Sequence, residues 1–153
     1  MCIRDRGRIE QGLLIQAKQH DYSVRSLLAN AEDAERFKDG SFITVYLSPR
    51  GYHRIHMSDG GTLTSMTHVP GRLFSVAPSS VETIPSLFAR NERVVTLFET
   101  PNGAMAMVLV GAMNVAAIET VWAGLITPFG KLSRKQPTRW RYGGNRNLSL
   151  IHI

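Results

Sequence analysis

The stretch that decides the fold runs from residue 92 to residue 110. It reads Glu92-Arg93-Val94-Val95-Thr96-Leu97-Phe98-Glu99-Thr100, then Pro101-Asn102-Gly103, then Ala104-Met105-Ala106-Met107-Val108-Leu109-Val110. The first and last parts are dominated by β-branched, aromatic and other apolar residues, which favour strands. Asn-Gly tolerates the positive φ angles that tight hairpin turns need. The sequence therefore predicts two antiparallel strands joined by a hairpin turn.

Further strands are predicted on both sides of this hairpin. The run Phe42-Ile43-Thr44-Val45-Tyr46-Leu47 is β-branched and aromatic throughout, which is typical of a strand. Asp59-Gly60-Gly61 predicts a turn, followed by a half-exposed strand over residues 62–69 because apolar and polar residues alternate there in part. We also predict strands over residues 9–17 and 118–122.

Short helices are predicted between the strands. Ser23 can cap a helix over residues 24–28, and Asn30 can open a second one over residues 31–37, which Gly40 ends. Residues 86–90 predict a single helical turn. The predicted fold class is therefore α+β, made mostly of antiparallel β-strands and hairpins with a few short helices.

Composition indicates one soluble globular domain with a basic tail. The chain has 153 residues, of which 43% are hydrophobic and 20% charged. The whole net charge of +6 arises beyond Glu119, the last acidic residue, from a set of six cations: Lys131, Arg134, Lys135, Arg139, Arg141 and Arg146. We expect a domain over residues 7–128 and a poorly ordered basic tail over residues 129–147. Such a tail suits phosphates or an anionic membrane surface, and a merely solvated tail is the alternative.

The two ends of the chain look unlike the rest. Residues 1–6 and 148–153 resemble translated sequencing-adapter read-through, so we expect neither to belong to the natural protein. The single cysteine, Cys2, rules out an internal disulfide and fits a reducing compartment.

His53 and His56 are the candidate catalytic residues. They follow the strand at 42–47 and a Ser48-Pro49 turn, where a rigid sheet passes the chain to a loop that can expose a functional group. Imidazole titrates near neutral pH and can take up and return protons. Two other interpretations stay open at this point. One is a metal site that recruits residues such as His68, Asp59 or Glu92, although their spacing is not that of metal ligands. The other is a pair of histidines without a chemical role.

A family resemblance strengthens the catalytic interpretation. The run Tyr46-Leu47-Ser48-Pro49-Arg50-Gly51-Tyr52-His53-Arg54-Ile55-His56-Met57 resembles bacterial-type phosphatidylserine decarboxylases. Other matching blocks follow in the order of that family: Val69-Pro70-Gly71, Leu73-Phe74-Ser75-Val76, residues 87–94, Val110-Gly111-Ala112, residues 119–124 and Thr127-Pro128. The resemblance covers residues 7–128.

The resemblance implies a carboxy-lyase that is made as a proenzyme. Members of this family cleave themselves at a Gly-Ser bond in a Leu-Gly-Ser-Thr sequence, and the serine becomes a covalent pyruvoyl group. Phosphatidylserine forms a Schiff base with that group and leaves as phosphatidylethanolamine after losing CO2. His56 matches the base of an Asp-His-Ser triad that drives the cleavage. His53 matches a residue near the pyruvoyl group that returns a proton.

The resemblance also implies partners and marks what this sequence lacks. The expected partners are phosphatidylserine, a C-terminal α chain carrying the pyruvoyl group, the cytoplasmic face of the cell membrane through peripheral contact, and a second copy in a homodimer, but no nucleic acid. No Leu-Gly-Ser-Thr occurs here, the triad aspartate would precede Gly7, and Gly51 replaces the family's usual aspartate. We therefore expect this segment by itself to be inactive.

A second hypothesis belongs to a different functional class. Residues 131–146 interleave Trp140 and Tyr142 with Arg139 and Arg141, a pattern compatible with stacking on bases. Under this hypothesis the chain is a non-catalytic basic β-domain that binds nucleic acid or anionic lipid.

Overall fold

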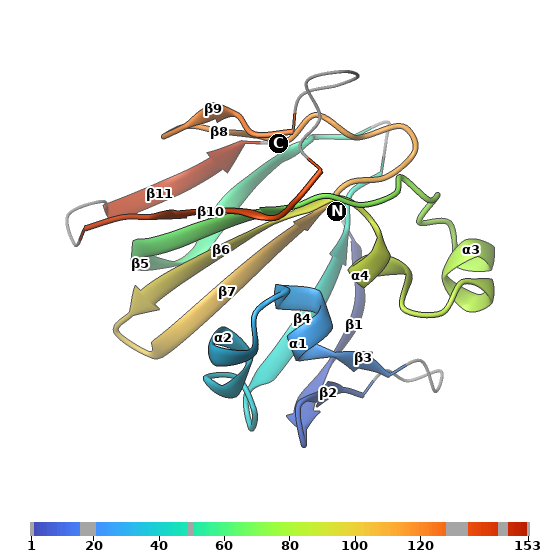
Figure 1. Cartoon of the computed structure of the whole chain (residues 1–153), viewed down its shortest axis with the longest axis horizontal. Coiled ribbons are helices and arrows are strands. Elements are labelled where there is room, and N and C mark those ends of the chain that lie inside the picture. The colour runs from blue at the N-terminus through green and yellow to red at the C-terminus, as the bar shows by residue number, and fades with distance from the viewer. Residues whose placement is uncertain (1, 16–20, 49–50, 128–134, 144–146, 153) are drawn as a thin grey trace. The chain divides into compact units, whose positions relative to one another are not determined.

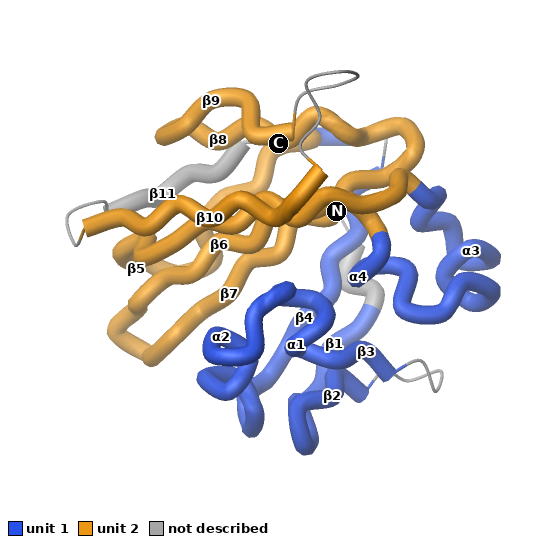
Figure 2. Tube along the Cα trace, viewed as in Figure 1, with its two compact units in different colours: residues 1–52, 74–90 blue, residues 53–73, 91–153 orange. Residues whose placement is uncertain are grey.

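The computed structural model describes residues 2–15, 21–48, 51–127, 135–143 and 147–152 (Figure 1). The chain divides into two units (Figure 2): unit 1 contains residues 1–52 and 74–90, and unit 2 contains residues 53–73 and 91–153. The chain therefore passes between the units three times. The predicted α+β class is confirmed, because antiparallel strands dominate both units and the helices are short.

The predicted hairpin forms the centre of unit 2. Strand β6 (Arg93–Thr100) pairs with β7 (Gly103–Val110) in one unbroken antiparallel register, from Arg93 opposite Val110 to Thr100 opposite Gly103. Gly103 has a φ of 112°, a conformation that glycine adopts without steric cost. The hairpin prediction is confirmed.

Strand β5 (Arg54–Val69) is longer than the sequence predicts. It runs for 16 residues and pairs with β6 over Thr62–Val69, with β10 (Thr138–Arg141) and with β11 (Asn147–His152). The predicted turn at Asp59-Gly60-Gly61 is wrong, because these residues continue the strand. The Asp59 carboxylate accepts from Gly60 N and from Asn102 Nδ2, both at 2.8 Å, so it ties the strand to the β6–β7 turn.

Gly61 is required for close packing rather than for a turn. A Cβ atom at this position would lie 3.0 Å from the Glu99 carbonyl oxygen and 3.1 Å from Thr100 Cγ2. The neighbouring Gly60 has no such contact. The strand can therefore approach β6 closely only because residue 61 lacks a side chain.

The core of unit 2 lies on one face of its sheet. It consists of residues that are almost completely buried: Leu63, Met66, Val94, Phe98, Leu109, Ile118 and Ile126. Strands β8 (Glu119–Thr120) and β9 (Gly124–Leu125) form a small separate ladder, so the strand predicted over 118–122 is shorter than expected. Thr127 fixes the segment that leads into β8, since its hydroxyl donates to Ala116 O at 2.6 Å and accepts from Ile118 N at 2.7 Å.

Part of the expected basic tail is an ordered strand. β10 pairs with β5 from Thr138 opposite His68 to Arg141 opposite Ser65, and Arg139 Nη2 donates to Ser65 Oγ at 3.1 Å. Its strand propensity and the packing of Trp140 against the core explain this order. Residues 128–134 and 144–146, including Lys131, Arg134 and Arg146, lie outside the described residues.

Unit 1 contains a sheet in the order β3-β2-β1-β4. These strands are β1 (Cys2–Glu10), β2 (Leu13–Leu14), β3 (Tyr22–Ser23) and β4 (Ser41–Tyr46). The single strand predicted over residues 9–17 is wrong, because a two-residue turn separates β1 from β2. Gln11 (φ 51°) and Gly12 (φ 78°) both have positive φ, as in the hairpin turns whose twist matches paired strands. Residues 16–20 lie outside the described part.

The helices of unit 1 begin where the sequence predicts. Helix α1 (Val24–Leu28) is capped by Ser23 Oγ, which accepts from Ser26 N at 3.3 Å, and α2 (Ala31–Glu35) by Asn30 Oδ1, which accepts from Asp33 N at 3.0 Å. Helix α4 (Leu87–Arg90) is the predicted single turn, whereas α3 (Pro78–Thr83) was not predicted. In the described part of the chain, no helix is long and apolar enough to cross a membrane.

The packing of Gly61 predicts a difference between two adjacent glycines. In the full-length protein that carries this segment, Gly61→Ala should lower the free energy of unfolding by about 1–3 kcal/mol, because the new methyl group overpacks the β5–β6 contact. Gly60→Ala is the matched control and should leave the free energy unchanged or raise it by up to about 1 kcal/mol, since alanine reduces the entropy of the unfolded chain. Urea denaturation of both variants measures the difference. Equal effects would contradict the assigned close approach.

Candidate active site

His56 is displayed on the exposed face of strand β5. Exposure alternates along this part of the strand, with Arg54, His56 and Ser58 exposed and Ile55 and Met57 half-buried. Ile55 and Met57 pack against the hydrophobic core of unit 2. Because neighbouring side chains on a strand point to opposite faces, the packing of these two residues fixes the direction in which His56 points.

His53 lies one residue before β5 and is half-buried. The alternation of exposure extends through this position, so His53 falls on the side of Ile55 and Met57, opposite His56. Along an extended chain the two residues are roughly 10 Å apart. The geometry therefore fits two separate proton carriers better than one hydrogen-bonded histidine pair.

The environment of the two histidines differs from the predicted one. The sequence predicts that both lie in a loop, but His56 is part of β5, since the strand begins at Arg54. Tyr52, just before His53, is 61% exposed. Pro49 and Arg50, which belong to the same motif, lie outside the described residues. The structure thus places His56 on a rigid element and leaves the chemical roles of both histidines as predictions.

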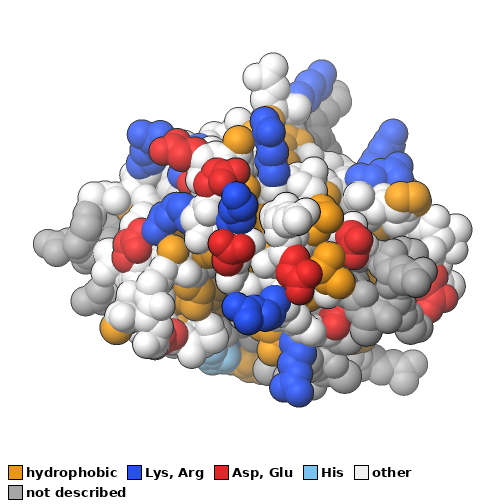
Figure 3. Space-filling model, turned by 90° about the horizontal axis from the view of Figure 1, so that it is seen from below, with side chains coloured by type: hydrophobic (Ala, Val, Ile, Leu, Met, Phe, Trp, Pro, Cys, Tyr) orange, Lys and Arg blue, Asp and Glu red, His pale blue; other side chains and the backbone are white. Residues whose placement is uncertain are grey.

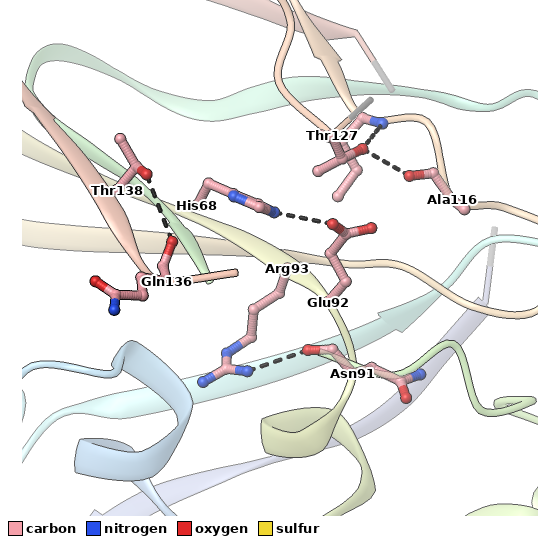
Figure 4. A network of polar contacts seen from close by, with 9 residues as sticks. His68, Asn91, Glu92, Arg93, Ala116, Thr127, Gln136 and Thr138 are labelled. Carbon is pink, nitrogen blue, oxygen red and sulfur yellow. Dashed lines mark hydrogen bonds and ion pairs between the residues drawn. The ribbon is translucent and has the colours of Figure 1, made fainter. Parts of the chain in front are cut away.

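A second polar cluster lies at the other end of β5, and the sequence did not single it out as a unit. His68 has no exposed surface, and its Nε2 lies 2.9 Å from Oε1 of Glu92, whose side chain is 12% exposed. Figure 4 shows the two side chains pointing toward each other. His68 Nδ1 has no hydrogen-bond partner among the described residues, so an Nε2–H that donates to Glu92 leaves Nδ1 as a bare acceptor.

Arg93 extends this cluster into the interior. It is 2% exposed, and its Nη1 donates to Asn91 O at 3.1 Å (Figure 4). Burial lowers the pKa of the Arg93 guanidinium to about 10, so the group stays charged at neutral pH. Its burial removes it from the surface where a lipid phosphate would bind.

Backbone contacts join the cluster to the places where the chain leaves and re-enters unit 2. Glu92 N donates to Arg72 O at 2.8 Å, and Gly111 N donates to Glu92 O at 2.9 Å. The fully buried side chain of Asn91 donates through Nδ2 to Gly111 O at 2.9 Å. The segment with residues 91–93 is therefore held from both sides, and we interpret the cluster as a structural element.

The described residues give little support to the other interpretations. No group of three or more His, Cys, Asp and Glu side chains among them is arranged to hold a metal ion. Trp140 and Tyr142 are half-buried and pack against the core of unit 2, so they do not form an open platform for bases. On the face shown in Figure 3, basic and acidic side chains are interspersed, which agrees with the balance of twelve Lys/Arg and twelve Asp/Glu in residues 1–130.

Comparison with known proteins gives one consistent family. The sequence model described as "Phosphatidylserine decarboxylase" matches residues 2–144. Curated relatives named phosphatidylserine decarboxylase proenzyme include one from Shewanella pealeana, 62% identical over 123 residues, which are 80% of this chain and 43% of the relative. Another, from Vibrio cholerae, is 53% identical over 151 residues, which are 98% of this chain and 52% of the relative. The chain spans about half the length of the curated relatives it matches.

The buried His68–Glu92 contact predicts a stability difference between two substitutions. In the full-length protein, Glu92→Ala should lower the free energy of unfolding by about 1–3 kcal/mol, because it leaves a buried donor on His68 without an acceptor. Glu92→Gln retains an oxygen acceptor and should cost less. Glu99→Ala removes an exposed acid from the same hairpin and should change the free energy by no more than about 0.5 kcal/mol. Chemical denaturation measures all three, and equal losses for the two Glu92 variants would contradict the assigned hydrogen bond.

Proposed function

Because this chain belongs to the phosphatidylserine decarboxylase family, we propose that the intact protein converts phosphatidylserine to phosphatidylethanolamine with a pyruvoyl group formed by self-cleavage of a proenzyme. The observation that carries the proposal is the family match over residues 2–144, which includes His53 and His56. This chain supplies the segment of the enzyme that contains His53 and His56. The pyruvoyl-forming serine and the triad aspartate would come from the rest of the protein.

His56 is proposed as the base in self-cleavage. A serine hydroxyl attacks only when a base accepts its proton. His56 is exposed on a strand whose opposite face is packed into the core, so a serine from another segment can reach it without rearrangement of the sheet. An aspartate on the far side of the ring would fix the tautomer and favour the imidazolium that forms, as in hydrolase triads.

His53 is proposed as the proton carrier in decarboxylation. When present, the pyruvoyl group supplies an electron sink for the pair left behind by CO2. His53 fits a place beside that group because its imidazole is half-buried, next to a strand, and able to hold and return one proton. Partial burial would limit access of water to this proton, which favours delivery to the substrate carbon.

The proposal also includes the location and the partners of the intact protein. Its substrate is a membrane phospholipid, so the reaction would take place at the cytoplasmic face of the cell membrane, with the protein in peripheral contact. The name proenzyme on the curated relatives supports a cleaved partner chain that carries the pyruvoyl group. The intact protein is further proposed to form a homodimer.

The role of His56 predicts a defect in processing. In the full-length proenzyme, His56→Ala should slow self-cleavage by at least about a hundredfold, because loss of a general base typically costs factors of 10²–10⁴. Ser58→Ala is the matched control: Ser58 is the next exposed residue along β5, its hydroxyl donates to Met105 Sδ at 3.3 Å, and its variant should cleave normally. Separation of the proenzyme and its two product chains on a denaturing gel follows the reaction. Normal cleavage of His56→Ala would exclude the proposed role.

The role of His53 predicts a defect after processing. His53→Ala should cleave into its two chains but release CO2 from phosphatidylserine at least about a hundredfold more slowly, because the proton is no longer delivered. His53→Gln is the matched variant, since it keeps hydrogen-bonding groups but cannot shuttle a proton, and it should be equally slow. Release of labelled CO2 from vesicles that contain phosphatidylserine provides the measurement. Wild-type rates in either cleaved variant would remove His53 from the reaction.

A further inference from the structure

Strand β7 (Gly103–Val110) is the last strand in the sheet order β10-β5-β6-β7 of unit 2. Its inner edge pairs with β6 along its full length. On its outer edge, no strand pairs with it among the residues that the structure describes. An edge of this length presents a row of backbone donors and acceptors to any other strand.

The backbone groups on the outer edge can be identified from the register. Gly111 N donates to Glu92 O at 2.9 Å, and pairs of residues along an antiparallel ladder alternate between bonded and non-bonded. The register of β6 and β7 has no shift between Arg93 and Thr100. The N–H groups of Met105 and Met107 therefore point toward β6, and those of Ala106 and Val108 point outward.

The sequence and register of β7 lack the features that protect a solvent-facing edge. Natural edge strands carry charges or proline, contain a bulge, or are very short. β7 is eight residues long, consists of glycine, alanine, methionine, valine and leucine, and forms an unbroken register with β6. An edge of this composition left open to solvent would promote association with other chains.

We propose that the outer edge of β7 pairs with a strand of the partner chain that proenzyme cleavage produces, so that the sheet of unit 2 continues into that chain. The inference rests on the proposed function in one respect, namely that a partner chain of the same proenzyme exists. About half the length of the curated relatives lies outside this chain, which is far more than one strand needs.

A strand of the same proenzyme fits this edge better than a second copy does. An eight-residue strand is about 26 Å long and a sheet layer about 10 Å thick, so edge pairing covers roughly 260 Å² per partner. A stable interface between separate proteins needs about 800 Å² per partner. A strand made as part of the same polypeptide is present at millimolar effective concentration, and a small contact is then sufficient. The tethered strand can remain in place after the cut.

The test is amide hydrogen exchange at single residues in the full-length protein. The outward amides of Ala106 and Val108 should exchange at least about a hundredfold more slowly than unprotected amides, as the internally bonded amides of Met105 and Met107 do. These two serve as the matched control within the same strand. Exchange of Ala106 and Val108 at unprotected rates, with Met105 and Met107 protected, would overturn the proposal.

Two further measurements identify the occupant of the edge. Protection that persists on dilution to the monomer supports a strand of the same molecule, whereas protection lost on dilution indicates a second copy and overturns the proposal. A photoreactive residue in place of Ala106 should crosslink to the partner chain in the cleaved protein. A crosslink to residues 1–52 or 74–90 would overturn the assignment.

The same exchange experiment on the His56→Ala proenzyme separates this inference from the proposed function. Strand pairing does not require the cut, so Ala106 and Val108 should be protected in the uncleaved variant as well. If the wild-type protein neither cleaves nor decarboxylates while Ala106 and Val108 are protected, the proposed function is contradicted and the strand pairing stands. If the wild-type protein cleaves and is active while the amides of Ala106 and Val108 are unprotected, the strand pairing is overturned and the proposed function stands.

Discussion

The backbone ladder between β5 and β6 is the constraint on which the rest of unit 2 depends. It holds β5 over Thr62–Val69, and pairing with β11 continues the strand back to Arg54, so that one 16-residue strand carries the exposed His56 near its start and the buried His68 near its end. Gly61 makes this possible, because a side chain at that position would meet the Glu99 carbonyl. The Asp59 bond to Asn102 then fastens the part of β5 that extends toward the β6–β7 turn. A shift of one residue in this ladder would turn His56 toward the core and Ile55 toward solvent.

The two ends of β5 use polar groups in different ways. At the start, His56 is exposed on a strand whose other face packs against the core, which suits a group that must meet a reactant. At the end, His68 Nε2 bonds to Glu92 and Arg93 donates to the Asn91 backbone in the interior. Such a buried network resists rearrangement, since breaking any one bond leaves another group unpaired. The candidate chemistry therefore lies at the accessible end of a strand whose other end is anchored.

The sequence was most informative where structure is determined by neighbouring residues. Ser23 and Asn30 cap their helices through their own side chains, and Asn102-Gly103 makes a local turn, so all three were predictable. Prediction failed where distant residues decide. Asp59-Gly60-Gly61 has turn composition, but the pairing of Gly61 with β11 and the contact of Asp59 with Asn102 keep it extended. Gln11 adopts positive φ although glutamine carries no signal for it. His53 and His56 were selected as candidate site residues from their motif, whereas the His68–Glu92 contact joins residues 24 positions apart and had no local signal.

The threefold passage of the chain between the two units has a consequence for biosynthesis. Unit 1 includes residues 74–90, and unit 2 begins at residue 53, so neither unit can be completed from one continuous stretch. Translation proceeds at about 5–20 residues per second, so the 38 residues from 53 to 90 delay completion of unit 1 by about 2–8 s. During that interval strands β1–β4 lack the helices α3 and α4 of their own unit, and β5 lacks β6. The nascent chain thus exposes unpaired strands for seconds, a period in which a ribosome-bound chaperone would have the greatest effect on yield.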